Sequence, residues 1–451
     1  MKAPELLSPA GTLNTMRYAF AFGADAVYAG QPRYSLRARN NEFMNDNLAI
    51  GIQEAHALNK KFFVAVNTMP HNSKVKTFID DLDPVIQMKP DALIMADPGL
   101  IMMVREKYPE QVIHLSVQMN TVNYAAAKFW QNQGIEHIIL SRELSLNEVE
   151  EIRQACPDLE LEVFVHGALC IAYSGRCLLS GYFNHRDPNQ GTCTNSCRWQ
   201  YKTHETSEDA ENNLHVLPAD SLDVANAMSV GACGDQERHP LADKTYFLEE
   251  KNRPGELMPV TEDEHGTYIM NSKDLRAVEH VKRLTEIGVD CLKIEGRTKS
   301  HYYAARTAQV YRMAIDDAVA GREFDPKYLG ILENLANRGY TDGFFERHHT
   351  HEYQSYIENS SKSHKQQFVA ELIATDKEAG TIDVDVKNRF SVGDRMELVL
   401  PNGKNIDFTL EGMENLKDGE TMEVAPGSGY QVRLPIKGVD SDKAFLARYF
   451  D

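Results

Sequence analysis

The stretch AIGIQEAHALNKKFFVAVN, residues 49–67, contains the pattern that decides the fold. Its first part, 49–59, has apolar residues at helical spacing, and its second part, 62–67, is a short apolar run rich in β-forming residues. Apolar residues three and four positions apart predict an amphipathic helix, whereas a short continuous apolar run predicts a buried strand. The stretch therefore predicts a surface helix that leads into a buried strand.

The same alternation recurs from the N-terminus to about residue 295. The expected strands are 5–8, 26–30, 62–67, 92–97, 113–118, 137–142, 161–166 and 291–295. Helical periodicity separates most of them, at 49–59, 100–107, 124–134 and 145–155. Strands that alternate with helices pair in parallel, because the helix supplies the crossover connection. Eight such units, with no glycine-rich dinucleotide fingerprint after the first strand, predict a (β/α)8 TIM-type barrel, regular or distorted, rather than an open sheet.

A long insertion separates the last two expected strands. Residues 167–290 far exceed an ordinary βα connection, and such length indicates a functional element. The insertion, placed at 168–270, carries most of the cysteines and then an acidic stretch, 205–265, whose role stays open. A helix at 272–287, capped by Asn271 or Ser272, is expected to lead into the last strand.

The C-terminal part of the chain has a different pattern. After a helix at 301–319, residues 321–365 are polar and are expected to form a linker or helical extension. From 366 to 451, short alternating runs and the turn Pro401-Asn402-Gly403 predict a small all-β barrel domain. The expected division is therefore a barrel over 1–320, a linker over 321–365 and a β domain over 366–451.

Composition limits the function classes. The 451 residues carry a formal net charge of −18, which argues against a protein that coats nucleic acid by bulk electrostatics. Any RNA contact must therefore be a local basic patch. No apolar stretch is long enough to cross a bilayer, so we expect a cytoplasmic protein without a membrane partner. Seven cysteines in a reducing compartment favour metal or redox use over disulfides.

Four cysteines form a constellation within the insertion. Six residues separate the first pair and three separate the second; the four are Cys170, Cys177, Cys193 and Cys197. Four thiolates suit either an iron-sulfur cluster or a structural zinc ion. Zinc sites usually contain two tight Cys-x2-Cys pairs, so the wider spacing favours a cluster. Cys233 is a reserve ligand, while Cys156 and Cys291 are expected in the core.

Polar residues at the carboxyl ends of barrel strands are the next candidates, because these ends build the active site of a parallel barrel. The expected set is Ser8, Tyr28, Gln31, Asn67, Asp97, Gln118, Arg142, Glu143, Glu162, His166, Lys293, Glu295 and Arg297. Lys293, Glu295 and Arg297 alternate in KIEGR and so share one strand face. They either bind a substrate carboxylate or form a buried ion network; ligand contact is favoured for Arg297.

Two further features have open alternatives. His166 is either an acid or base or a hydrogen-bonded histidine beneath the cysteine segment. Arg33, Arg37 and Arg39 follow the second expected strand and form the best local anion or RNA patch in an acidic chain. The alternative for the three arginines is an ordinary solvated loop.

The segment EVFVHGALCIAYSGRCLLS, residues 162–180, resembles the signature of the collagenase-like peptidase U32 family. ELLSPAG, GADAVYAG, NQGTCTNSCRW and the NSKDL and LKIEGR segments stand where that family has them, and the β domain is similar to its C-terminal domain. The similarity covers essentially the whole chain. It is strongest to a bacterial member that hydroxylates tRNA.

This resemblance implies a specific chemistry. It implies a 4Fe-4S cluster on the four cysteines and oxygen-independent 5-hydroxylation of the wobble uridine of tRNA, with prephenate as the source of the hydroxyl group. An electron donor is a further expected partner. Prephenate is a dicarboxylate, for which Arg297 and Arg142 are the candidate ligands; the wider catalytic set adds His166, Glu162, Lys293 and Glu295.

Three alternatives remain at this point. A peptidase is suggested by the family's name, but the sequence has no convincing Ser-His-Asp or HExxH arrangement. A hydroxylase could act on another substrate, such as an rRNA base or a quinone precursor. A structural or sensory cluster without catalysis is the third alternative.

Overall fold

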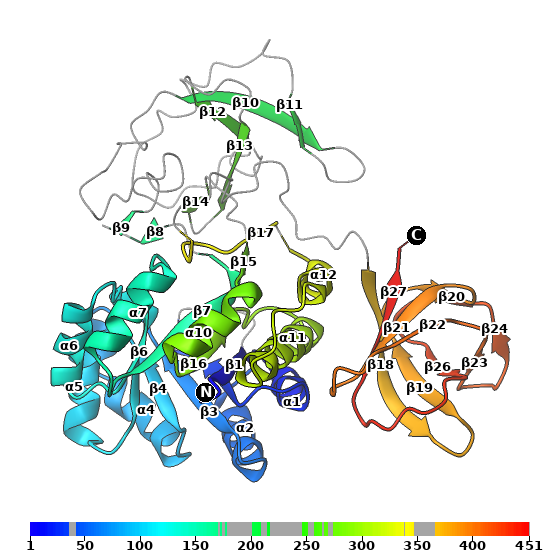
Figure 1. Cartoon of the computed structure of the whole chain (residues 1–451), viewed down its shortest axis with the longest axis horizontal. Helices are drawn as coiled ribbons and strands as arrows, with labels where there is room; N and C mark the ends of the chain where they lie inside the picture. The colour runs from blue at the N-terminus through cyan, green and yellow to red at the C-terminus, as the bar shows by residue number, and fades with distance from the viewer. Residues whose placement is uncertain are drawn as a thin grey trace.

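A computed structural model of the chain describes residues 1–35, 42–169, 274–337, 339–346 and 366–450, together with the backbone of short strands between 172 and 268 (Figure 1). Three parts are visible in Figure 1: a helix-covered barrel, a group of strands beyond one end of the barrel, and a β domain beside it. None of the helices in these described ranges has the length and apolar character needed to span a membrane.

Eight parallel strands close the barrel, which confirms the TIM-type fold expected from the sequence. The strands are β1 (Glu5–Pro9), β2 (Ala26–Gly30), β3 (Lys61–Val66), β4 (Ala92–Met95), β5 (Ile113–Leu115), β6 (His137–Ile139), β7 (Glu160–Ala168) and β16 (Cys291–Ile294). They pair in chain order from β1 to β7, and β16 closes the ring by pairing in parallel with both β1 and β7. Their apolar runs are almost wholly buried, as is usual for strands that are covered on both faces.

Helices cover the outside of the barrel, where apolar stripes at helical spacing pack against the strands. They are α1 (Leu13–Ala21), α2 (Asn45–Ala57), α3 (Asn72–Val75), α4 (Phe78–Gln87), α5 (Pro98–Lys107), α6 (Tyr124–Asn132), α7 (Leu146–Ala155), α10 (Val281–Ile287), α11 (His301–Val319) and α12 (Lys327–Glu333). Side-chain caps fix several starts; Ser145, for example, forms a reciprocal capping box with Glu148 at α7.

One expected helix is shorter than the sequence pattern indicates. The predicted helix 272–287 begins only at Val281; before it, β15 (Asp274–Arg276) pairs antiparallel with the end of β7. The last residues of β7 extend beyond the barrel rim and offer backbone hydrogen-bonding groups, which the extended chain satisfies better than a helix would. A two-residue strand, β17 (Tyr340–Thr341), then pairs in parallel with β15. The expected cap, Asn271 or Ser272, lies outside the described residues.

The insertion contributes two small antiparallel groups of strands. The hairpin of β8 (Ala172–Tyr173) and β9 (Arg176–Cys177) follows the end of β7. A five-stranded sheet is formed by β10 (Tyr201–Glu208), β11 (Leu214–Val216), β12 (Tyr246–Glu250), β13 (Leu257–Asp263) and β14 (Gly266–Tyr268). Both groups lie beyond the carboxyl ends of the barrel strands in Figure 1, the end where barrel enzymes have their active sites.

The C-terminal domain is an antiparallel β half-barrel with its own apolar core. Its strands are β18 (Gln366–Asp376), β19 (Thr381–Val386), β20 (Phe390–Ser391), β21 (Arg395–Val399), β22 (Ile406–Thr409), β23 (Met413–Asn415), β24 (Thr421–Met422), β25 (Val424–Ala425), β26 (Gln431–Leu434) and β27 (Phe445–Tyr449). The expected turn at Pro401-Asn402-Gly403 joins the hairpin of β21 and β22, where Gly403 has a positive φ of 72°.

Candidate active site at the barrel mouth

A network of charged side chains occupies the barrel interior. Glu162 of β7 is fully buried and accepts a hydrogen bond from the Lys293 ammonium on β16, with 2.7 Å between Oε1 and Nζ. Its second oxygen lies 2.8 Å from Nε2 of His137 on β6, and Nδ1 of His137 lies 2.9 Å from Glu160. Each buried charge in this network therefore has an opposite partner, as burial requires.

The network fixes the protonation of its members. Burial alone would lower the pKa of His137, but hydrogen bonds to Glu160 and Glu162 outweigh it and raise the pKa to about 9. Burial raises the pKa of Glu162, yet Lys293 and His137 together bring it well below its usual range. His114 stacks on His137 with 3.7 Å between ring centroids, and burial with the neighbouring positive charge lowers its pKa. Near neutral pH His137 is therefore protonated, Glu160 and Glu162 are ionised, and His114 is neutral.

His114, His137 and Glu162 also have the spacing of a metal site, since their ligand atoms all lie within 4.8 Å of one another. A metal ligand must offer a free lone pair, however, and neutral imidazole is the ligating form of histidine. Both ring nitrogens of His137 donate to carboxylates, and Lys293 neutralises Glu162. His137 and Glu162 are thus engaged with each other and with Lys293, so a metal ion held by these three residues would have to replace those contacts.

Above this network, Arg142 and Glu295 form an ion pair at the mouth. Nη2 of Arg142 lies 3.2 Å from Oε2 of Glu295, and Nη1 donates to the carbonyl of Ala168 at 2.8 Å. The guanidinium also sits 3.8 Å from the centroid of the Phe164 ring, a cation–π contact that holds its plane. Three contacts therefore hold the Arg142 side chain in place, close to the start of the cysteine segment.

Arg297 is held on the opposite side of β16 from the Arg142 pair. Its Nη1 donates to Oγ of Ser35 at 2.6 Å, and its guanidinium lies 5.6 Å from the centroid of the Tyr28 ring. Lys293 contacts the same ring at 4.4 Å. A Cβ atom at Gly30 would lie only 2.8 Å from Nη1 of Arg297, so the side chain occupies space that only a glycine leaves open.

Lys293, Glu295 and Arg297 were expected to share one face at the end of the last strand. The structure gives each its own main partner: Glu162 for Lys293, Arg142 for Glu295 and Ser35 for Arg297. Lys293 lies in the buried network, whereas Glu295 and Arg297 lie nearer the rim. The Tyr28 ring links the two levels, because Lys293 and Arg297 both lie over it.

His166 lies near the end of β7 and is buried to 1% exposure. A register shift between β7 and β16 occurs next to it, and its ring packs against Tyr303, Tyr311 and Tyr340 rather than beside Glu162. Nδ1 lies 3.3 Å from the Tyr311 hydroxyl. Burial lowers the pKa of His166 to about 3, so the imidazole is neutral near pH 7.

Other expected mouth residues mainly organise the loops. The carboxylate of Asp97 caps α5 by accepting from the amide of Leu100, and the side-chain oxygen of Gln31 accepts from the amides of Arg33 and Tyr34. Ser8 is fully buried at the end of β1. Tyr28, Asn67, Gln118 and Glu143 complete the expected set; Tyr28 donates to the carbonyl of Ile294, and Glu143 accepts from Ser141.

The expected RNA patch and cluster ligands lie mostly outside the described residues. Arg33 is half-exposed and pairs with Asp81 at 2.7 Å, while Arg37 and Arg39 are outside the described ranges. Cys177 lies in β9, where it pairs with Ala172 across the hairpin. The undescribed cysteines of interest are Cys170, Cys193, Cys197 and Cys233. Cys156 and Cys291 are buried and free, as expected for core residues.

Sequence reasoning did not single out His114, His137, Glu160 or Ser35. A signal for the first three exists, because His114 interrupts a short apolar strand, and His137 and Glu160 are polar residues at the start of one. Glu160 and Glu162 also alternate at the start of β7, which places them on one strand face. Ser35 carries no such signal, since its role depends on the loop that brings it to Arg297.

A closed parallel barrel that carries an arginine–carboxylate pair and a second arginine at its carboxyl-end rim has the arrangement of a TIM-barrel enzyme site. The chain belongs to peptidase family U32: the model of that family matches residues 11–355, and the model of the U32 C-terminal domain matches residues 364–448. The two matches cover the barrel with its insertion and the β half-barrel, respectively.

Three relatives illustrate the similarity. The tRNA hydroxylation protein P of Escherichia coli (strain K12) is 61% identical over 453 residues, which cover 100% of this chain and 98% of the relative. The protein of the same name from Haemophilus influenzae is 58% identical, over 99% of this chain and 96% of that one. The tRNA hydroxylation protein P1 of Bacillus subtilis (strain 168) is 32% identical, over 94% and 90%.

Proposed function

We propose that this chain is a tRNA-modifying enzyme that hydroxylates the wobble uridine at C5 to 5-hydroxyuridine, without molecular oxygen. The observation that carries the proposal is 61% identity, over the full length of this chain, to a protein named for tRNA hydroxylation. The identity includes both domains, so the whole architecture is shared rather than a barrel alone. Prephenate is the proposed source of the hydroxyl group.

The proposed cofactor is a 4Fe-4S cluster, held by Cys170, Cys177, Cys193 and Cys197. The donor set fits this group, because four thiolates within one short segment supply the soft sulfur ligation that such clusters need. The segment begins where β7 ends, next to Arg142 and Ala168. When bound, the cluster would supply redox or Lewis-acid chemistry at the barrel mouth, with an electron donor as a further partner.

The barrel residues have proposed roles in binding and orientation. Arg142 and Arg297 would bind the two carboxylates of prephenate, since a guanidinium offers paired donors to a carboxylate. Glu295 would hold Arg142 in place through their 3.2 Å contact. Below the arginines, the ion pair of Glu162 and Lys293 would hold the side chains of the barrel interior in fixed positions. His166, a neutral and enclosed imidazole, would serve as a proton acceptor only when the mouth admits substrate.

RNA would approach the same mouth. Arg33, Arg37 and Arg39 are the proposed contacts to tRNA phosphates, and Arg33 is half-exposed beside β2. Its pair with Asp81 is a surface ion pair and costs little to exchange for a phosphate.

Peptidase activity is the second candidate, and the family description is the observation that favours it. The chain has no HExxH motif, and cysteines that hold a cluster are not free to act as nucleophiles. Hydroxylation of another substrate, such as an rRNA base or a quinone precursor, would use the same cluster and barrel. A tRNA nucleoside profile separates these cases.

The decisive experiment expresses this chain in a bacterial strain that lacks tRNA uridine hydroxylation and measures 5-hydroxyuridine derivatives by mass spectrometry. We expect the derivatives to return with the intact chain and to be absent with Arg297→Ala and Arg142→Ala. Unchanged nucleosides with a folded, cluster-loaded protein would contradict tRNA as the substrate. The anaerobic reaction of purified protein with unmodified tRNA should depend on added prephenate.

The cluster assignment has its own prediction. Changing any one of Cys170, Cys177, Cys193 or Cys197 to alanine should remove the iron and acid-labile sulfide, which in the intact protein should be about four of each per chain. Cys156→Ala is the matched control and should leave the iron content unchanged, because Cys156 is a buried residue at the end of α7. Equal iron in all five variants, or stoichiometric zinc without iron, would overturn the assignment.

A further inference from the structure

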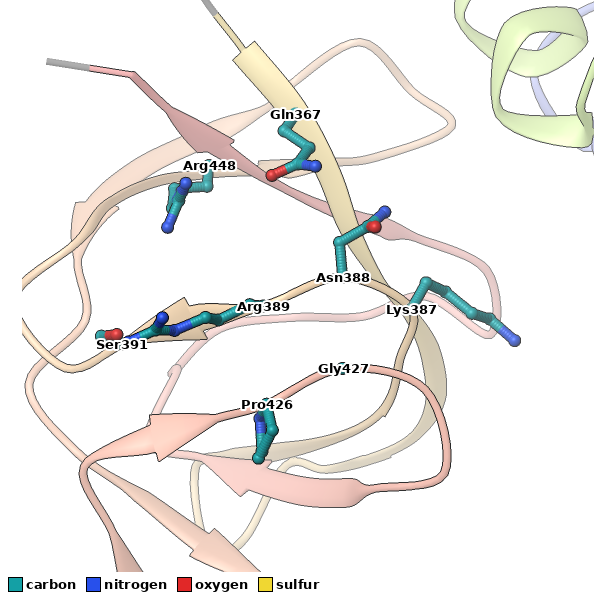
Figure 2. A pocket seen from close by; sticks show the side chains of 8 residues that line it. All are labelled: Gln367, Lys387, Asn388, Arg389, Ser391, Pro426, Gly427 and Arg448. Atoms are coloured by element: carbon teal, nitrogen blue, oxygen red, sulfur yellow. The ribbon is translucent and has the colours of Figure 1, made fainter. Parts of the chain in front are cut away.

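The C-terminal half-barrel carries a basic pocket that none of the roles above uses (Figure 2). It is an open depression of about 480 Å³ between the start of β18, the turn that follows β19, the loop that follows β25 and the end of β27. Three cations line it: Lys387, Arg389 and Arg448. Figure 2 shows Arg389 and Arg448 facing the same space, with Gln367 and Asn388 on the adjoining wall.

The charge of this pocket contrasts with that of its domain. Residues 366–450 contain 10 Lys and Arg against 15 Asp and Glu, so the domain as a whole is acidic. No carboxylate is among the side chains that line the pocket. A cavity lined by one sign of charge concentrates counter-ions even when the net charge of the protein repels them. The pocket is therefore an anion site in an acidic surrounding.

The backbone holds the pocket in a fixed shape. The amides of Lys387 and Asn388 both donate to the carbonyl of Val369, at 2.8 and 3.1 Å, and the Asn388 side chain donates to the carbonyl of Phe368. These bonds fasten the turn after β19 to β18, and the next residue is Arg389. The Arg389 side chain is therefore attached to a main chain that hydrogen bonds hold in place.

The three cations differ in how far they are already neutralised. Lys387 lies 2.5 Å from Asp385, and Arg448 lies 3.4 Å from Asp394 and 5.3 Å from the Phe450 ring centroid. Arg389 is exposed and forms no ion pair with any carboxylate in the described part of the chain. Arg389 is therefore the cation whose charge is available to a ligand, with Arg448 as its ordered neighbour.

We propose that this pocket binds the phosphodiester backbone of the RNA substrate, at a second point of attachment remote from the barrel mouth. The inference rests on the proposed function, because it takes tRNA as the molecule bound. Arginines supply the bidentate donors that phosphate oxygens accept, and the neutral side chains of Gln367, Asn388 and Ser391 supply hydrogen bonds suited to phosphate and ribose hydroxyls. Such a set binds backbone without reading base sequence.

The placement of the pocket agrees with a two-point attachment. Gln367 is the second residue of β18 and Arg448 lies near the end of β27. In Figure 1 these strand ends point to the same side of the molecule as β8, β9 and β15 at the barrel mouth. The half-barrel is also fastened to the barrel, since Arg306 of α11 donates to both oxygens of Glu397 at 2.7 Å. A tRNA bound at both places would therefore meet two anion sites in a fixed relation.

The test measures the affinity of full-length unmodified tRNA for the Arg389→Glu variant over a series of salt concentrations. We expect about five- to tenfold weaker binding and a salt dependence shallower by about one in the slope of log K against log salt, as for one lost phosphate contact. Lys437→Glu is the matched control: it makes the same charge change on an exposed residue beside Gly380, at the turn that joins β18 to β19. The control should bind tRNA as the intact chain does.

The outcomes separate this inference from the proposed function. Equal affinity and equal salt slope for Arg389→Glu and Lys437→Glu would overturn the pocket, while restored 5-hydroxyuridine in the expression strain would leave the proposed function standing. Equal weakening of both variants would also overturn it, because net charge alone would then account for the loss. Specific weakening by Arg389→Glu together with unmodified nucleosides would support the pocket and contradict the hydroxylase proposal.

Discussion

His137 is buried and yet has a raised pKa, so its neighbours must outweigh the cost of burying a positive charge. Its ring lies between two carboxylates, and its exposed fraction is only 4%. The cationic form is the one that both hydrogen bonds require. Because the folded pKa of about 9 exceeds the ordinary value of 6.5, folding stabilises the protonated imidazole.

This linkage predicts a pH dependence of stability. The contribution of His137 is fully present below pH 6.5 and is lost as the pH rises through about 9, on the order of 3 kcal/mol in total. We therefore expect the unfolding temperature to fall over that window, and His137→Gln to remove most of this slope while lowering the stability at pH 6. Thermal unfolding followed by circular dichroism from pH 6 to 9.5 measures both. A parallel decline in the intact chain and the variant would show that other groups cause it.

A second prediction concerns the stability cost of replacing Gly167, which lies where β7 extends beyond the barrel. Its φ is +103°, and a Cβ atom there would lie 2.4 Å from the backbone carbonyl oxygen of Glu295. Gly167→Ala must therefore move backbone, not only a flexible side chain. Gly288→Ala is the matched control, because Gly288 also has a positive φ, +86°, but open space around its Cβ position.

We expect Gly288→Ala to cost about 1 kcal/mol for the left-handed backbone alone. Gly167→Ala should cost about 1–3 kcal/mol more, the usual range for forced overpacking. Chemical denaturation of both variants gives the difference. Equal losses of unfolding free energy in the two variants would mean that the backbone around Glu295 moves aside without cost. The barrel rim would then be more deformable than its hydrogen bonds indicate.

At the level of strands and helices, the apolar runs predicted most of the barrel. Each expected strand overlaps an observed one, because a strand buried on both faces must be continuously apolar and the sequence shows this directly. The strands β5 and β6 are shorter than expected. After Leu115, Ser116 caps a short 3-10 turn at Val117–Met119, and its hydroxyl accepts from the amide of Gln118.

The strand at residues 274–276 and the orientation of His166 share a cause, which is pairing with a distant segment. Residues 274–276 look helical locally but form β15, because the protruding end of β7 offers them an edge. Strict alternation along β7 would place His166 on the face of Glu162, yet the irregular pairing with β16 turns it toward Tyr303 and Tyr311. Local periodicity contains no information about either partner.

The candidate site was predictable to a similar extent. Arg142, Glu295 and Arg297 could be selected because they end strands of a predicted barrel, and the structure does place the first two in contact. The partners that hold them could not be selected. Ser35 reaches Arg297 through the closure of the barrel, which joins segments 262 residues apart, whereas the Phe164 ring reaches Arg142 between the neighbouring strands β6 and β7.

For the molecule as a whole, the junction between barrel and half-barrel is a buried ion pair within an apolar surface. Arg306 is 1% exposed, and Glu397 also accepts from the side chains of Gln366 and Asn405. Around them, Phe445 of β27 stacks on Tyr18 of α1 with 4.5 Å between ring centroids. This junction makes the second RNA contact useful, because only a fixed domain can hold a phosphate at a set distance from the mouth.

Breaking the pair from one side should therefore uncouple the two domains. Arg306→Met keeps the apolar stem but leaves Glu397 buried without a cation, a change that typically costs about 3–5 kcal/mol. We expect calorimetry to show an earlier transition that separates from that of the barrel, because the half-barrel has its own apolar core. Arg433→Ala, which removes a partly exposed bidentate pair with Asp383 in the same domain, is the control and should cost less than Arg306→Met, without separating two transitions. If Arg306→Met left one transition at an unchanged temperature, the ring contacts alone would hold the domains together, and the ion pair would have no part in fixing the pocket relative to the mouth.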